Sequence, residues 1–241
     1  MLNVITPETV KSSITEIKDG IRISLDWPLD KPSHPAFDRQ RFSHEILNKA
    51  PMAMNDDEIR INTQSSTQLV LMGHPKWQAT IAFQTGAVTL ADLHAIINEH
   101  DIVLRPADIL FIRVGFTAEY EKLSTQEKQD FSTRKPGGLL GLEANRDTLR
   151  WLWNNQFAAI ASDAAGFERG PATGPYNDPD VSIHQWCLAG WGMPIGELFD
   201  LEELAGACRE RKRYTFFLQS TPLKIPGGVA SPANAVTFYK P

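Results

Sequence analysis

The stretch TLRWLWNNQFAAIASD (148–163) decides the fold class, because a helical segment runs directly into an apolar strand. TLRWLWNNQ (148–156) has helical character, and FAAIASD (157–163) is an apolar run that ends in an acid. Upstream, TLADLHAIINEH (89–100) repeats its apolar residues at helical spacing, and ADILFIRVG (107–115) predicts a buried strand that ends at a glycine. Helices that alternate with strands indicate an α/β fold.

The remaining elements lie towards the two ends of the chain. Thr6-Pro7 predicts the capped start of a helix that runs to about Lys18, and GIRISLDW (20–27) alternates like a half-buried strand. Asp200 and Glu203 suggest a capping box that opens a helix through LEELAGACRERK (201–212). Two further strands are expected at 214–221 and 235–240.

Composition excludes several classes of protein. The 241 residues carry a net charge of -5, so no basic surface favours nucleic acid. The two cysteines, Cys187 and Cys208, make neither a disulfide framework nor a closed zinc site. MLNVITPETVKSS (1–13) lacks the pattern of a signal peptide, and no stretch is long and apolar enough for a membrane span. We expect one soluble, cytoplasmic domain over 1–241, without nucleic-acid or membrane partners.

The segment TQSSTQLVLMGHPKW (63–77) reads like a metal-ligand motif in which most ligands have been replaced. Gln64 and Gln68 lie four residues apart, and His74 follows. Zn²⁺ and Mn²⁺ prefer imidazole, thiolate or carboxylate, whereas a neutral amide oxygen is a weak donor. Elsewhere, Asp163 ends a predicted strand and Glu168 follows within five residues. Such acids either face a ligand crevice or remain solvated at the strand end. No Ser-His-Asp signature is present.

Four longer segments carry a family resemblance: 107–124, GLEANRDTLRWLWNNQFAAIASDAAGFE (141–168), IHQWCLAGWGMPIGELFDLEELA (183–205) and 215–236. They resemble the cyclase family, which includes bacterial kynurenine formamidase and isatin hydrolase, and are most similar to its fungal branch of secondary metabolism. The resemblance implies a swivelling β/β/α fold and a homodimer or higher homo-oligomer. It also implies a role in tryptophan catabolism or in the biosynthesis of secondary metabolites.

The same resemblance assigns roles to four positions within the segment 63–77. Family hydrolases carry His-x-x-x-His-x-Asp-x-x-x-His, and those four positions fall here on Gln64, Gln68, Val70 and His74. The first three positions bind metal in the family, and the last is the general acid/base. A further ligand pair matches His184 and Glu197. The chain also departs from the family in a late start and a shortened segment around 75–87, which implies a more open pocket or one completed by a partner subunit.

Three functional hypotheses follow. The first is a hydrolase of amide, lactam or lactone bonds, with Zn²⁺ or Mn²⁺ held by His184 and Glu197 and with His74 moving the proton. The second is a metal-independent cyclase or isomerase that uses His74, His184 and Glu197 on a small-molecule substrate. The third is a non-catalytic ligand-binding or scaffold relative. In each, the expected substrate-binding residues are Gln64, Gln68, Asp163 and Glu168.

Overall fold

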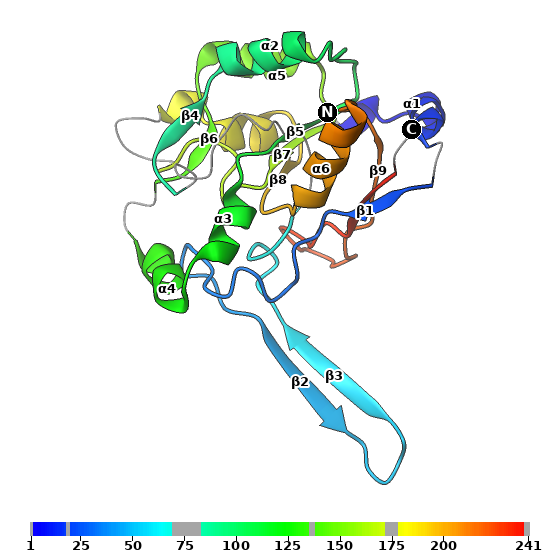
Figure 1. Ribbon diagram of the computed structural model, residues 1–241, viewed down its shortest axis with the longest axis vertical. Helices are drawn as coiled ribbons and strands as arrows, with labels where there is room; N and C mark the ends of the chain where they lie inside the picture. Colours follow the sequence, from blue (N-terminus) through cyan, green and yellow to red (C-terminus); the bar gives the residue numbers. More distant parts are fainter. Residues whose placement is uncertain (1, 18–19, 69–82, 135–137, 172–177, 239–241) are drawn as a thin grey trace.

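The computed structural model describes residues 2–17, 20–68, 83–134, 138–171 and 178–238 and has mixed α/β architecture, as the sequence predicts (Figure 1). Its centre is a parallel sheet in the order β5 (Ile109–Ile112), β7 (Ala159–Ser162) and β8 (Ile195–Gly196). All four residues of β7 are buried. This apolar run without alternation is typical of a parallel strand covered on both faces.

Helices follow the parallel strands closely along the chain. A second parallel pair joins β4 (Gly86–Val88) to β6 (Leu140–Leu142), and α2 (Leu90–Glu99) and α5 (Arg146–Asn154) come directly after these two strands. The Thr89 side chain accepts from the Asp92 amide at the start of α2, and the Asn145 side chain accepts from Thr148 N, 2.8 Å away, at the start of α5. These caps satisfy amides that otherwise have no helical partner.

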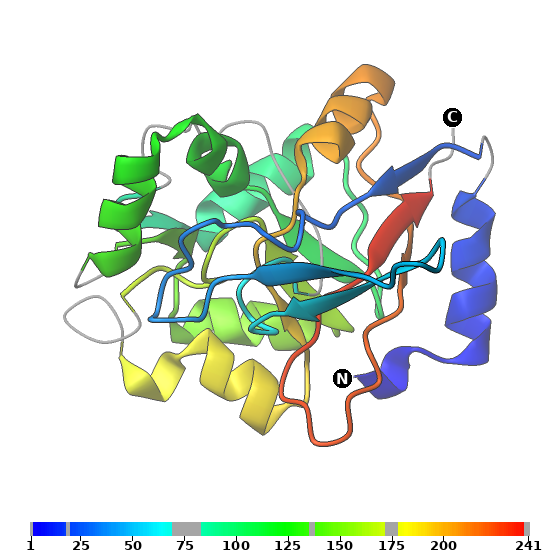
Figure 2. The same ribbon diagram turned by 90° about the horizontal axis from the view of Figure 1, so that it is seen from below.

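Shorter helices and an antiparallel sheet complete the body. Strand β5 leads into α3 (Phe116–Lys122) and α4 (Thr125–Thr133). The antiparallel sheet has the order β1 (Arg22–Ser24), β10 (Ala235–Phe238) and β9 (Phe217–Ser220). Figure 2 shows it between α6 (Glu202–Arg211) and the amino-terminal turns, which are η1 (Leu2–Val4), α1 (Pro7–Ser13) and η2 (Ile14–Glu16).

A hairpin of β2 (Ser43–Asn48) and β3 (Asn55–Arg60) projects away from the body (Figure 1). Nearly every residue of the two strands is exposed. The sequence did not predict this hairpin, because a ribbon that faces solvent on both sides lacks the alternation of a half-buried strand.

Two helix predictions can be compared with the observed ends. The start at Thr6 and Pro7 is confirmed, but α1 ends at Ser13 and continues only as the single 3-10 turn η2. The prediction of a capping box at Asp200 is wrong. Helix α6 begins at Glu202 after Leu201, which has no hydrogen-bonding side chain, and Asp200 Oδ1 instead accepts from Glu202 N at 3.2 Å.

The core lies on both sides of the central sheet. Leu152, Phe157, Ile160 and Phe167 are fully buried on one side, and Phe111 and Phe199 belong to a second cluster towards β1 and α6. Cys208 of α6 packs in this second cluster. Within the described residues, no helix has both the length and the apolar character needed to cross a bilayer.

Candidate functional site

The segment that carries both Gln residues is joined to the residue that follows β8. Gln68 N donates to the Glu197 carbonyl at 2.9 Å, and Glu197 N donates to the Gln68 carbonyl at 2.6 Å. Thr67 Oγ1 donates to the Leu198 carbonyl at 2.7 Å. The end of the central sheet therefore positions the described end of the motif at Thr67 and Gln68, although the two segments lie far apart in the sequence.

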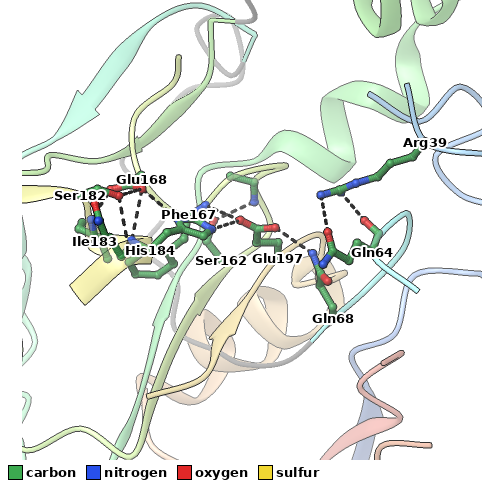
Figure 3. Close-up of polar contacts among 12 residues, drawn as sticks. Arg39, Gln64, Gln68, Ser162, Phe167, Glu168, Ser182, Ile183, His184 and Glu197 are labelled. Carbon is green, nitrogen blue, oxygen red and sulfur yellow. Dashed lines mark hydrogen bonds and ion pairs between the residues drawn. The ribbon is translucent and has the colours of Figure 1, made fainter. Parts of the chain in front are cut away.

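His184 lies between two carboxylates (Figure 3). Its Nδ1 is 2.9 Å from Glu168 Oε1, and its Nε2 is 3.1 Å from Glu197 Oε1. The residue precedes a π-helix, η5 (Gln185–Gly190), a form that often occurs at functional sites. The structure thus brings His184 and Glu197, which the family resemblance nominated as a pair, together with Glu168, which was nominated separately.

Glu168 fixes the position of His184. Its carboxylate also accepts hydrogen bonds from Ser182 Oγ and from the backbone N–H groups of Ile183 and His184. Burial alone would raise the pKa of Glu168, but the hydrogen bond and charge of His184 hold it below its usual range. Because its acceptor sites are used by the protein, Glu168 acts here as a positioning group rather than a substrate contact.

The two carboxylates keep His184 protonated. Burial disfavours the imidazolium, but the hydrogen bonds and charges of Glu168 and Glu197 outweigh burial and raise the pKa of His184 to about 10. At neutral pH both ring nitrogens therefore carry protons and donate. The side chain is still 38% exposed, so a bound molecule can reach it.

The Glu197 carboxylate accepts three hydrogen bonds. Its Oε1 accepts from Phe167 N at 3.1 Å as well as from His184, and its Oε2 accepts from Gln68 Nε2 at 2.8 Å. The Gln68 amide must present its NH₂ group, since its oxygen would repel the carboxylate. Gln68 therefore acts as a hydrogen-bond donor to Glu197.

Arg39 is the functional candidate that the sequence analysis missed. One of its guanidinium nitrogens donates to the Gln64 carbonyl, and another donates to Gln64 Oε1 at 3.0 Å. Burial lowers the pKa of Arg39, while the charge of Glu197 opposes that effect. Phe37 and Asp38, just before it, both have positive φ, and such strained positions concentrate at functional sites. These left-handed conformations at non-glycine residues have no signature in the loop's sequence.

These groups open into one pocket of about 410 Å³. Its polar lining comes from Arg39, Gln64, Gln68, His184, Glu197 and Ser231. Its apolar side comes mainly from Leu188, Ile195 and the loop after β9, including Leu223, Ile225 and Val229. A pocket with a charged end and an apolar wall suits a small amphipathic molecule.

Two nominated residues do not join this group. Asp163 is fully buried and accepts from Val114 N at 2.6 Å and Gly115 N at 2.7 Å, so it ties the ends of β5 and β7 together. Burial raises its pKa to about 7, against the pull of these hydrogen bonds and of Arg113. It does not line the pocket. His74 lies outside the described residues, as does Val70.

The side chains that line the described part of the site are not arranged to coordinate a divalent cation. The imidazole of His184 is bonded at both nitrogens, Glu197 already accepts three N–H groups, and Gln68 presents a donor. A metal ion needs free lone pairs, and the nearby Arg39 adds a competing positive charge. Among the described residues, no group of three or more His, Cys, Asp and Glu side chains is arranged to hold a metal. We therefore derive no step through a metal.

Comparisons with known proteins agree with this fold. Residues 77–169 match the family Cyclase, described as "Putative cyclase". A crystal structure of a novel cyclase shares 25% identity with a TM-score of 0.82, covering 98% of this chain and 94% of that one. Isatin hydrolase A from Ralstonia solanacearum shares 13% identity with a TM-score of 0.70, covering 98% of each chain. No curated protein matches the chain.

A structure described as a potential metal-dependent hydrolase with cyclase activity is more distant. It shares 12% identity with a TM-score of 0.57, covering 91% of this chain and 99% of that one. At such identity the likeness concerns the fold alone. The family match over residues 77–169 and the similarity to the novel cyclase support a cyclase-family protein with the architecture of these structures. Its relatives are of cyclase and hydrolase type.

Proposed function

We propose that the protein is a metal-independent acid–base enzyme that cyclises or isomerises a small carbonyl compound. The observation that carries this proposal is the placement of His184 between Glu168 and Glu197 at the wall of an open pocket. Glu197 would accept a proton from the substrate at the one carboxylate acceptor site that its three hydrogen bonds leave. The adjacent imidazolium would stabilise or protonate the oxygen that becomes negative. General acid–base help of this kind is worth roughly 10²–10⁴ in rate.

Arg39 and the Gln side chains would stabilise the negative charge that develops on the substrate. The guanidinium and the Gln68 amide line the same pocket as Glu197, and the Gln68 amide contacts Glu197 directly. Fixed donors near a developing oxyanion stabilise it without reorganisation, provided that water is largely excluded. The apolar wall would hold an aromatic or polycyclic body. A role in secondary metabolism or tryptophan catabolism belongs to this proposal, because both offer such compounds.

Hydrolysis of an amide, lactam or lactone bond is the second candidate, and the fold similarity to isatin hydrolases favours it. Glu197 would then activate water instead of a C–H or O–H group, and His74 would remain the proton carrier nominated from the sequence. A non-catalytic ligand-binding protein is the third, favoured by the replacement of the metal ligands with Gln64, Gln68 and Val70.

One set of assays separates the three. The protein is dialysed against chelator and incubated in D₂O with an aryl 1,3-dicarbonyl compound, and separately with an aryl lactam and an aryl formamide. The proposal expects faster deuterium exchange at the acidic carbon than in protein-free buffer, measured by NMR, without metal. Hydrolysis of the lactam or formamide without exchange would support the second candidate. Binding without either reaction would support the third.

A further inference from the structure

A second pocket lies between α5 and η5, and the candidate site does not use it. Its volume is about 780 Å³, which is within the range of pockets that hold small molecules. Among the described residues it shares no lining residue with the pocket beside His184, because η5 presents Leu188 to that pocket and a different face to this one. The residues that line the second pocket are Arg146, Leu149, Arg150 and Trp153 from α5, Gln185, Trp186, Ala189 and Gly190 from η5, and Asp180, Val181 and Trp191 beside η5.

The second pocket contains a cluster of three tryptophans. The ring of Trp191 lies 5.2 Å from that of Trp153 and 6.0 Å from that of Trp186, measured between ring centroids. Trp153 and Trp186 are 50% and 44% exposed, although tryptophan side chains are on average highly buried. Trp186 Nε1 donates to the Asp180 carbonyl at 2.7 Å, which fixes the orientation of its ring. The cluster therefore presents a preformed aromatic surface on which a planar ring can pack.

Positive charge lies beside the tryptophans. Arg146 and Arg150 line the pocket, and Asp180 is the one acid in its described lining. Arg146 is exposed at the start of α5. Arg150 pairs with Asp147 at 3.1 Å, but the two side chains are 70% and 78% exposed. An exposed ion pair of this kind contributes little, so Arg150 is available to a bound anion.

The tryptophans and arginines together select an aromatic anion. A planar ring packs against tryptophan, and a guanidinium binds a carboxylate through two parallel hydrogen bonds. A quaternary ammonium group also packs on tryptophan rings, but the two arginines would repel it. In a chain of net charge -5, the local excess of positive charge distinguishes this pocket from the average surface.

We propose that the second pocket binds a planar aromatic carboxylate. The aromatic ring packs among Trp153, Trp186 and Trp191, and the carboxylate is held by Arg146 together with Arg150. Burial of the exposed indole rings supplies affinity, and the guanidinium groups supply selectivity for the negative charge. The pocket is separate from the one beside His184, so this inference does not depend on the proposed chemistry.

Indole N–H signals in a proton–nitrogen NMR spectrum locate the bound molecule. The chain has six tryptophans, and the signal of each is assigned by its replacement with phenylalanine. On titration with 1-naphthoate, the signals of Trp153, Trp186 and Trp191 should shift together and saturate. Trp151 lines a different, apolar pocket between α2 and α6, so its signal should not shift with them. The described lining of the His184 pocket contains no tryptophan, so binding there would leave the three signals unchanged.

A neutral probe and three variants separate the role of charge from that of the rings. The isostere 1-naphthamide should bind roughly tenfold more weakly than 1-naphthoate, because hydrogen bonds between charged groups are the stronger ones. Arg146→Gln should weaken 1-naphthoate by a similar factor and leave 1-naphthamide unchanged. Arg209→Gln, at an exposed arginine on α6, is the matched control and should change neither. Trp186→Ala should weaken both probes.

Several outcomes would overturn the proposal. They are the lack of a saturable shift at the three tryptophans, a shift confined to Trp151, equal affinity for the two probes, and binding of 1-naphthoate by Arg146→Gln at the natural affinity. Should Trp186→Ala fail to fold by circular dichroism, Trp153→Ala, at the more exposed ring, replaces it with the same expected result.

Discussion

His184 Nε2 lies 3.1 Å from Glu197 Oε1, and this contact joins a π-helix to the end of the central parallel sheet. Glu168 holds the opposite side of the ring at 2.9 Å. In this triad one cation is shared between two carboxylates, and the ring stays accessible from the pocket. The arrangement provides a base and a proton donor in contact with each other, and the following predictions depend on it.

The His184 ion pair should make stability depend on pH in the alkaline range. The folded-state pKa is raised from 6.5 to about 10, so the stabilisation is fully present below pH 6.5 and is lost as pH rises through 10. The difference in unfolding free energy between the natural protein and His184→Gln should therefore shrink from pH 6.5 to about pH 10. Urea unfolding at a series of pH values measures it. A difference that is constant over this range would contradict the raised pKa.

Asp163→Asn should lower the free energy of unfolding without lowering kcat/KM. The carboxylate accepts two buried backbone N–H groups, and an amide can accept only through its single oxygen. One N–H group left unsatisfied costs about 1–3 kcal/mol of unfolding free energy. Thermal or urea unfolding measures this loss, with Asp101→Asn on the exposed surface as control. A large drop in kcat/KM at unchanged stability would show instead that Asp163 contacts substrate.

Arg39→Lys should reduce activity although the charge is kept. The guanidinium makes two hydrogen bonds to Gln64, one to its carbonyl and one to its side chain, and a single ammonium group cannot reproduce that fork. Hydrogen bonds to charged groups contribute about 1.5–3 kcal/mol, so kcat/KM should fall roughly tenfold or more. Arg41→Lys, two residues away and exposed, is the matched control. Equal activities of the two variants would remove Arg39 from the site.

Metal content should be low and should rise when the missing ligands are restored. We expect less than one tightly bound Zn²⁺ or Mn²⁺ per chain, because amides and Val70 replace stronger donors. The triple variant Gln64→His, Gln68→His, Val70→Asp should bind more metal by elemental analysis after dialysis. A full equivalent retained by the natural protein after chelator treatment would show that a metal site exists.

The sequence predicted the layout of the body better than the geometry of the site. The apolar run in 157–163 and the helical spacing of apolar residues in 89–100 both reflect which side chains are buried. Burial of apolar side chains is the main determinant of the fold. The pairing of Arg39 with Gln64 depends on a loop with positive φ at two residues and no periodic signal. Glu168 was nominated for substrate, but its contact with His184 depends on how two distant loops meet. The hairpin of β2 and β3 has no buried face, so its pattern carried no strand signal.

The most direct test of the account is the effect of Glu197→Gln on proton exchange by chelator-treated protein. Glutamine keeps the size of the side chain but cannot accept a proton, whereas Glu203→Gln changes an exposed acid on α6 and serves as the control. Deuterium exchange into the 1,3-dicarbonyl probe should fall by roughly 10²–10⁴ in Glu197→Gln, with unchanged circular dichroism, and should be unaffected in Glu203→Gln. Exchange by Glu197→Gln at the natural rate, or exchange that appears only when Zn²⁺ or Mn²⁺ is added, would contradict a metal-independent acid–base site.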